Sequence, residues 1–387
     1  MSERLKSHVA VLGAVLLLAA GACGGKDKGA KSPGSPDTTG MSDGDAKGTG
    51  TVSNPGGAPG GNGGGANLPT PNGTGPEDPD DPNAGQDPDD GRSAAPVKAE
   101  PPVSDISEAD AKQQVEASLK VARSALAGSN RDPNAAIKAT KEALAVDPNN
   151  VDAVVLLAHA YYFRKLYDTA DVILLRALSS PNKKISNKAG QHAGLFYVRG
   201  LVYDETDQGE KAQLAYEEAH KLDPRHRGAL LNLAVHYIKD SRYAEAQGML
   251  ETLTSSLGVT TAAAWNNLGS AYRGRSVEAN LSKAQRDEFL TKAETAYKRS
   301  VDRDKNYGPA YYNLGLLYMD AKPFPMGGSD LDELKRLERA KTYFSDYRTM
   351  PGADINLVDE NLRQVDKAIK KEQKARKKKT ETKDDDW

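Results

Sequence analysis

The chain has 387 residues, of which 27% are charged, and its formal net charge is −2 at pH 7. This balance argues against a nucleic-acid-binding protein, which needs an excess of basic residues. The single cysteine excludes a disulfide framework and a multi-cysteine metal site. Only 38% of the residues are hydrophobic, beside 36 glycines and 21 prolines, which predicts that a sizeable part of the chain does not form a packed core.

Residues 1–22 have the three-part pattern of a secretory signal peptide. Arg4 and Lys6 supply the basic region, and an apolar run covers positions 9–20. This run is shorter than the ~20 residues of a membrane-spanning helix. Small residues then precede Cys23, and a small-residue site that ends in cysteine resembles the lipobox of bacterial lipoproteins. The resemblance implies cleavage before Cys23 and acylation of that residue, although Ala20 stands where the family most often has leucine.

Acylation of Cys23 implies that the protein is held on a membrane. Three acyl chains, as the lipoprotein family carries, exceed the two signals that stable anchoring requires. Gly24 and Gly25 follow the cysteine, and in that family the absence of aspartate there is typical of sorting to the outer membrane. We therefore expect a cell-envelope protein anchored to the outer membrane, on its periplasmic side. An ordinary signal peptide followed by a chance cysteine is the alternative.

After Cys23, residues 23–103 are predicted to form a disordered tether. Positions 24–103 contain no phenylalanine, tryptophan or tyrosine but hold 13 of the 21 prolines. Such a segment cannot bury enough apolar surface to offset the entropy lost on ordering. Seven acidic residues gather between positions 77 and 90 without the fixed frame of a calcium loop, so we interpret them as a self-repelling spacer.

From residue 104 onward the composition changes and an internal repeat becomes visible. All 16 tyrosines lie in this part of the chain. The pattern that starts at Trp265 recurs from Tyr311: a large residue, leucine three positions on, glycine four on and tyrosine seven on. These spacings fall on one face of a helix, and the glycine leaves room for a second helix. The sequence therefore predicts repeated helix pairs.

This pattern resembles the tetratricopeptide repeat, a helix–turn–helix unit of 34 residues. Two successive copies start at Phe196 and Leu230, which are 34 positions apart. The resemblance implies an all-α solenoid of about six repeats over residues 104–352, preceded by the disordered tether. A capping helix at 353–376 is expected to cover the end of the core, and residues 377–387 form a charged tail.

Three segments interrupt the repeat pattern. Residues 182–190 are a spacer between the second and third units, and about twelve extra residues around 275–286 separate the two helices of one pair. A further insertion carries Pro323 and Pro325, followed by two glycines. These residue types favour loops and turns.

The family resemblance also implies a superhelix whose first helices line a concave face. Its apolar and aromatic positions form the expected partner groove, consisting of Val155, Tyr162, Tyr197, Leu201, Leu231, Val235, Ile238, Tyr312, Leu316 and Met319. The middle of the face is polar, at Asn266, Ser270 and Arg273. An exposed apolar groove favours a partner with apolar anchors. The alternative is that an insertion or the C-terminal helix of the chain itself fills it.

No residue set in the sequence points to catalysis. His159 is a lone histidine on the groove face, where packing is its expected role. No nucleophile elbow, phosphate loop or metal-ligand spacing accompanies the helical part. We therefore expect no enzyme, no cofactor, no metal, no nucleic acid and no small-molecule substrate. The basic run that begins at Lys370 is interpreted as a solvated helix end.

Together these features predict a scaffold that binds envelope proteins through the groove and the membrane through Cys23. The order of parts is similar to that of tetratricopeptide lipoproteins in the myxobacterial gliding machinery. That resemblance implies an outer-membrane component of a trans-envelope motility complex. Two alternatives remain open. One is a pilotin-like lipoprotein that assists assembly of a pilus secretin or outer-membrane complex, and the other is a peptidoglycan-binding structural lipoprotein.

Overall fold

The computed structural model describes residues 107–384, and the side chains of residues 107–378. The predicted signal peptide, Cys23 and the tether lie outside the described residues, as do the last three positions of the chain.

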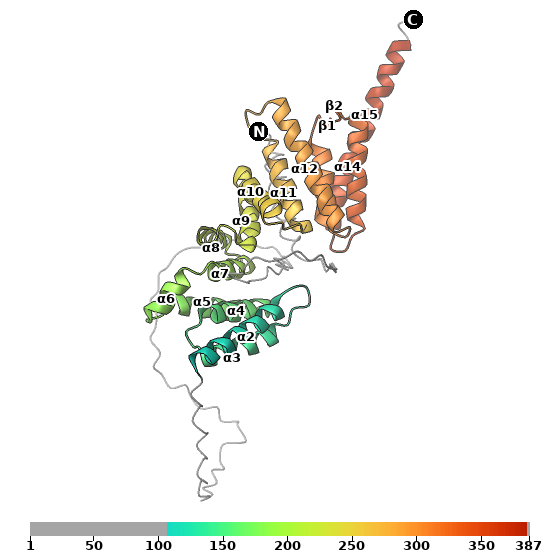
Figure 1. Cartoon of the computed structure of the whole chain (residues 1–387). Coiled ribbons are helices and arrows are strands. Elements are labelled where there is room, and N and C mark those ends of the chain that lie inside the picture. The colour runs from blue at the N-terminus through green and yellow to red at the C-terminus, as the bar shows by residue number, and fades with distance from the viewer. Residues whose placement is uncertain (1–106, 385–387) are drawn as a thin grey trace, which may run out of the picture. The chain divides into compact units, whose positions relative to one another are not determined.

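The described residues form an array of helix pairs that stack in chain order (Figure 1). Six pairs follow one another: α2 (Glu108–Leu126) with α3 (Pro133–Val146), α4 (Val151–Phe163) with α5 (Tyr167–Leu178), α7 (Ala193–Glu205) with α8 (Gly209–Leu222), α9 (Arg227–Lys239) with α10 (Tyr243–Glu251), α11 (Ala262–Arg275) with α12 (Lys283–Arg303), and α13 (Gly308–Asp320) with α14 (Glu333–Arg348). A final helix, α15 (Ile355–Asp384), packs on α14. This arrangement confirms the predicted all-α solenoid with a capping helix.

The three interruptions take different local structures. The spacer forms a short helix, α6 (Lys183–Gly190), and residues 276–282 form turns between α11 and α12. Outside these interruptions, α10 continues into a π-helical turn, η2 (Thr252–Ser256). The proline- and glycine-containing insertion forms a small antiparallel hairpin of β1 (Pro325–Met326) and β2 (Ser329–Asp330). Its turn residues Gly327 and Gly328 both have positive φ, as a two-residue hairpin turn requires.

Helix ends in the array follow from local side-chain chemistry. Helices α3 and α8 end directly before Asp147 and Asp223, and each aspartate precedes a proline that cannot continue a helix. After the interruption that follows α11, the Ser282 side chain accepts a hydrogen bond from the Gln285 backbone N–H, and Gln285 accepts one from the Ser282 backbone. This capping box fixes where α12 begins.

The glycine of the repeat pattern sits where two helices touch. A Cβ atom at Gly269 would lie 2.6 Å from the ring of Tyr297 on α12, and one at Gly315 would lie 2.6 Å from the ring of Phe344 on α14. Side-chain carbons do not approach one another that closely. The aromatic ring of the second helix therefore occupies the space that the glycine leaves on the first.

The tyrosine of the repeat pattern joins successive pairs. Its hydroxyl donates to a glutamate on the second helix of the preceding pair: Tyr237 to Glu217 at 3.2 Å, Tyr272 to Glu251 at 2.6 Å, and Tyr318 to Glu294. A hydrogen bond to a charged acceptor contributes roughly 1.5–3 kcal/mol. Each repeat is thus tied to its neighbour by a polar link as well as by apolar packing.

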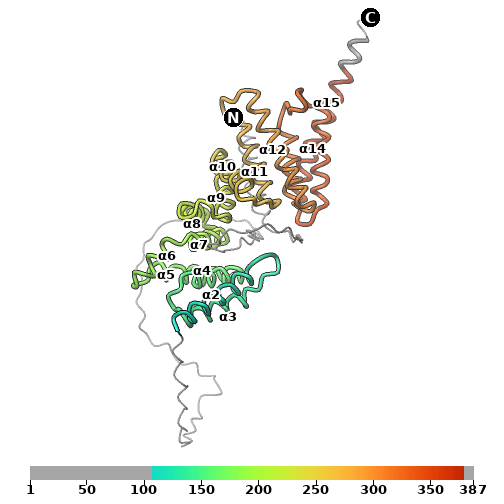
Figure 2. Tube along the Cα trace, in the orientation of Figure 1, coloured from blue at the N-terminus to red at the C-terminus, as the bar shows by residue number. Residues whose placement is uncertain are grey.

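The C-terminal helix runs antiparallel to α14. Three ion pairs fix this register: Arg348–Asp359 at 2.6 Å, Lys341–Asp366 at 2.7 Å and Arg376–Asp332 at 2.6 Å. The helix continues past the predicted boundary at 376 to Asp384, because its lysine, glutamate and arginine residues are strong helix formers. Figure 1 shows its last turns extending beyond α14, and Figure 2 traces the array in the same orientation.

Candidate functional site

The ten predicted groove residues lie on the first helices of the pairs, but most of them are inaccessible. Seven of the ten are buried, with at most 6% of their surface exposed: Val155, Tyr162, Tyr197, Leu201, Ile238, Tyr312 and Leu316. The other three, Leu231, Val235 and Met319, are partly exposed. The expectation of an open apolar groove along all ten residues is therefore wrong. We call Leu231 and Val235, which both lie on α9, the partner face.

Aromatic packing between successive first helices explains this burial near the N-terminal end. The Tyr197 ring lies 4.8 Å from that of His226, between centroids, and edge-on to that of His159. His159 also stacks on Phe163 at 4.7 Å. Burial, with a smaller contribution from the charge of Arg131, lowers the pKa of His159 to about 3. His159 is thus a neutral packing residue at pH 7, as the sequence led us to expect.

At the other end of the array the capping helix covers part of the predicted groove. Asn361 of α15 donates a hydrogen bond to the Tyr312 hydroxyl at 3.0 Å, and both residues are buried. The polar middle is buried as well, with Asn266 at 0% and Ser270 at 2% exposure. The chain itself therefore fills much of the concave side.

A polar cluster that sequence reasoning missed lies among α7, α8 and α9. Asp204 accepts a hydrogen bond from the Tyr216 hydroxyl at 2.8 Å and lies 2.9 Å from Nε2 of His236. Asn232 donates to the same hydroxyl at 3.1 Å. Burial, and then the charge of Asp204, raises the pKa of Tyr216 well above its usual value. Each of these groups has a hydrogen-bond partner and none is a nucleophile. The cluster therefore connects the α7–α8 pair to α9 through hydrogen bonds.

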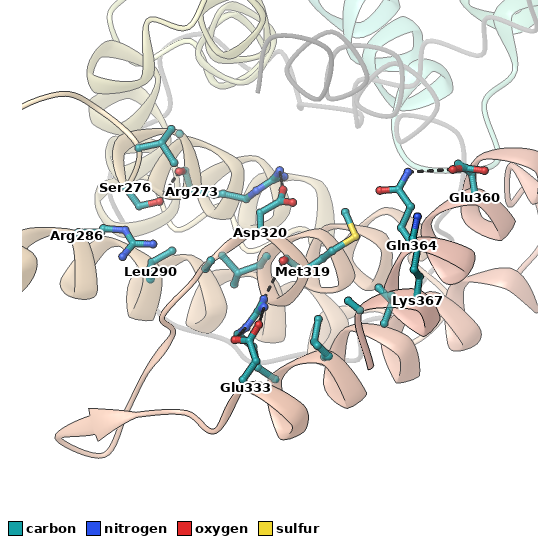
Figure 3. Close-up of a pocket in the computed structure, with 18 of the residues that line it drawn as sticks. Arg273, Ser276, Arg286, Leu290, Met319, Asp320, Glu333, Glu360, Gln364 and Lys367 are labelled. Atoms are coloured by element: carbon teal, nitrogen blue, oxygen red, sulfur yellow. Dashed lines mark hydrogen bonds and ion pairs between the residues drawn. The ribbon is translucent and has the colours of Figure 1, made fainter. Parts of the chain in front are cut away.

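An accessible cavity of the array lies near its C-terminal end. It encloses about 830 Å³ and is lined by the ends of α11 and α13, the starts of α12 and α14, and the middle of α15. Figure 3 shows Met319, Asp320, Gln364 and Lys367 around it. We call this cavity the C-terminal pocket. It brings together three successive first-helix positions, since α15 occupies the place of a seventh first helix.

An ion pair between a buried arginine and an exposed aspartate forms one wall of the C-terminal pocket. Nη2 of Arg273 donates to Asp320 at 2.9 Å, and Arg273 is 9% exposed (Figure 3). Its Nη1 is buried without a hydrogen-bond partner among the described residues. Burial alone would lower the pKa of Arg273, but the charge of Asp320 and its hydrogen bond to the guanidinium outweigh burial, so that the pKa lies above its ordinary value. The guanidinium therefore stays charged, and the pair links α11 to α13.

The opposite wall carries a second arginine, which is fully partnered. Arg336 of α14 is 2% exposed and donates to the carbonyl of Met319 at 2.8 Å and to Glu333 at 3.0 Å. The Arg336 hydrogen bond is the main reason that the pKa of Glu333 is low, and Lys322 adds to the effect. This arginine joins the end of α13 to the start of α14 and has a structural role.

The rim of the C-terminal pocket differs from its walls, because two of its lysines have no hydrogen-bond or ion-pair partner among the described residues. Lys367 and Lys371 of α15 are exposed and make no ion pair or hydrogen bond with any other described residue. Glu360 lies on the same helix, but Arg363 and Gln364 already donate to it. Counting all lining residues, five basic groups face three acidic ones. The pocket therefore favours an anionic occupant.

Sequence reasoning found one residue of the partner groove, Met319, that lines this pocket. It had placed Arg273 on the concave face without a role. It missed Asp320 and Lys367 and interpreted Lys371 as part of a solvated helix end, because these residues meet only through the antiparallel register of α15. The available signal was a basic residue at every fourth position of a helix predicted to end the solenoid.

Residues 129–183 match the tetratricopeptide repeat family. The matched stretch spans α3, α4 and α5. No curated protein matches the sequence significantly. A tetratricopeptide array is a protein-interaction scaffold whose extended surface binds peptides or proteins.

Several solved structures are similar to the array. PilW, described as a widely conserved type IV pilus biogenesis factor, is 19% identical with a TM-score of 0.42, covering 58% of this chain and 90% of PilW. MamA from Desulfovibrio magneticus RS-1 is 19% identical with a TM-score of 0.38, and the match covers 52% of this chain and 97% of the MamA chain. YrrB, described as having an unusual peptide-binding site, is 18% identical with a TM-score of 0.34, covering 52% and 90%. At these identities the likeness is one of fold alone.

Two further observations concern the described helical array. No helix within residues 107–384 has the length and apolar character that crossing a membrane requires. No group of three or more histidine, cysteine, aspartate or glutamate side chains in the described part could hold a metal ion.

Proposed function

We propose that this chain is a lipid-anchored scaffold of the bacterial cell envelope. Cys23 holds it on the outer membrane, on the periplasmic side, and the tetratricopeptide array binds other proteins of a trans-envelope machine. The order of parts, from lipobox through a long tether to interrupted repeats and a basic end, is similar to that of GltE, a lipoprotein of the myxobacterial gliding machinery. Gliding motility is therefore the role that we propose for the machine.

The observation that carries the binding proposal is the partner face. Leu231 and Val235 lie one helical turn apart on α9 and keep part of their apolar surface accessible, while their neighbours on the other first helices are buried. Two adjacent apolar side chains on an otherwise packed concave side suit an apolar anchor of a protein partner. A wall-polymer site would instead need accessible polar and aromatic groups, and the polar middle at Asn266 and Ser270 is buried.

The proposal is tested by cross-linking cells and co-purifying proteins on the native chain and on two double variants. Leu231→Glu with Val235→Glu places two charges on the partner face. The matched control, Leu214→Glu with Val172→Glu, makes the same replacements at side chains that are 64% and 50% exposed on α8 and α5.

We expect a defined set of envelope proteins on the native chain and on the control, and its loss from the partner-face variant. Circular dichroism establishes that both variants remain folded. The same proteins on all three chains, or no protein partner on the native chain, would contradict the proposal.

A further inference from the structure

The C-terminal pocket combines an apolar floor with unpaired cations at its rim. Val277, Met319 and Ala368 line it and keep part of their apolar surface accessible, with Val277 44% exposed. Lys367 and Lys371 stand at the edge with their ammonium groups in solvent and without partners among the described residues. Such a site suits a segment with one large apolar side chain and several carboxylates close beside it.

The chain itself contains a segment of this chemistry. Residues 384–387 are three aspartates followed by a tryptophan, one of two tryptophans in the sequence. A tryptophan side chain buries roughly 150–250 Å² of surface, and a cavity of about 830 Å³ leaves room for the aspartates beside it.

The pocket of the same copy lies out of reach of this segment. Helix α15 is continuous from the pocket residue Lys371 to Asp384. At a rise of 1.5 Å per residue, these positions are about 20 Å apart along a straight axis. Figure 1 shows the end of α15 leading away from the other helices. Only a second copy of the chain can present its segment to the pocket while α15 remains helical.

We propose that the C-terminal pocket receives residues 384–387 of a second copy of this chain. The incoming Trp387 lies against the apolar floor, and the incoming aspartates pair with Lys367 and Lys371. The inference rests on the proposed scaffold function, because it makes the scaffold a multi-copy assembly. It uses a different surface from the partner-face residues on α9, so the two proposals can fail separately.

Two measurements test this contact with the full chain carrying Cys23→Ser, which prevents acylation. Sedimentation velocity over a hundredfold range of concentration reports self-association. Fluorescence anisotropy reports binding of a labelled peptide with the sequence of residues 380–387, TETKDDDW. Trp387→Ala in the chain and in the peptide removes the apolar anchor.

The matched charge variants separate a specific contact from general attraction. Lys367→Glu with Lys371→Glu reverses the rim, whereas Lys370→Glu with Lys374→Glu makes the same change on exposed residues of α15 that do not line the pocket. We expect at least tenfold weaker self-association and peptide binding for the rim variant and for Trp387→Ala. The control variant should lose less than threefold. A chain that combines the rim variant with Asp385→Lys and Asp386→Lys should recover association.

Other outcomes overturn the inference. A chain that stays monomeric at every concentration, or association that the rim and control variants weaken equally, would exclude the proposed contact. Peptide binding by a monomeric chain would assign the pocket to an acidic segment of another protein and not to a second copy. If the rim variant still captures envelope proteins through the partner face, the scaffold function stands whatever the fate of this contact.

Discussion

Replacing Gly269 by alanine should destabilise the array, although alanine is the better helix former. The added Cβ would lie 2.6 Å from the ring of Tyr297. Cβ atoms in proteins essentially never lie within 3.0 Å of a non-bonded heavy atom. Tyr297 is 0% exposed, so its ring has no free space into which to move. Overpacking of this kind costs about 1–3 kcal/mol, while exchanging glycine for alanine in a helix gains about 1 kcal/mol. We therefore expect a Gly269→Ala chain to be less stable than the native one, by up to roughly 2 kcal/mol.

Gly248 provides the matched control for this prediction. It lies within α10, is exposed, and a Cβ there would meet nothing within 4 Å. Gly248→Ala should therefore stabilise the protein by up to about 1 kcal/mol. Urea unfolding followed by far-UV circular dichroism compares the three chains, and amide hydrogen exchange in α11 and α12 locates the change. A Gly269→Ala chain as stable as the native one would refute the reasoning that this glycine is a helix-contact position.

Three further predictions follow from single groups. The pKa of His159 is about 3 in the native state and near 6.5 when unfolded, so the unfolded state binds the extra proton between these values. The free energy of unfolding should therefore fall as the pH drops from 6.5 toward 3, by at most about 1.4 kcal/mol per pH unit from this group. His159→Phe should reduce the difference between the urea midpoints measured at pH 7 and at pH 5. Asp320→Ala leaves the buried Arg273 guanidinium unpaired and should lower the free energy of unfolding by about 1–3 kcal/mol. Arg273→Met in the same chain should recover part of this loss. A double variant less stable than Asp320→Ala would contradict this explanation. Cys23→Ser should release the protein from membranes, and a variant that still pellets with the outer membrane after a salt wash would remove the main support for the anchor.

Much of the fold was predictable because it depends on short-range patterns. The shared spacing that starts at Trp265 and at Tyr311 marks α11 and α13 as equivalent first helices. Aspartate followed by proline, as at Asp147, marks a helix end. These signals act within one or two turns, so they are legible in the sequence without knowledge of the neighbouring helices.

The accessible site was less predictable because it depends on contacts between distant residues. Tyr197 was expected to face an open groove, but the ring of His226, 29 positions later, packs against it. Whether such a position is open depends on the side chain that the next pair brings opposite it. The C-terminal pocket depends likewise on the register of α15 against α14, which the Arg348–Asp359 and Arg376–Asp332 pairs fix. Spacing within one helix contains no information about that register.

The central claim is that the concave side of the array binds envelope proteins at the partner face. Photo-cross-linking in living cells tests it most directly, with a photoreactive amino acid in place of Val235 on α9 or, as the matched control, of Val172 on α5. The account predicts cross-links to defined envelope proteins from position 235 and none from position 172. The same cross-links from both positions, or none from position 235, would contradict it.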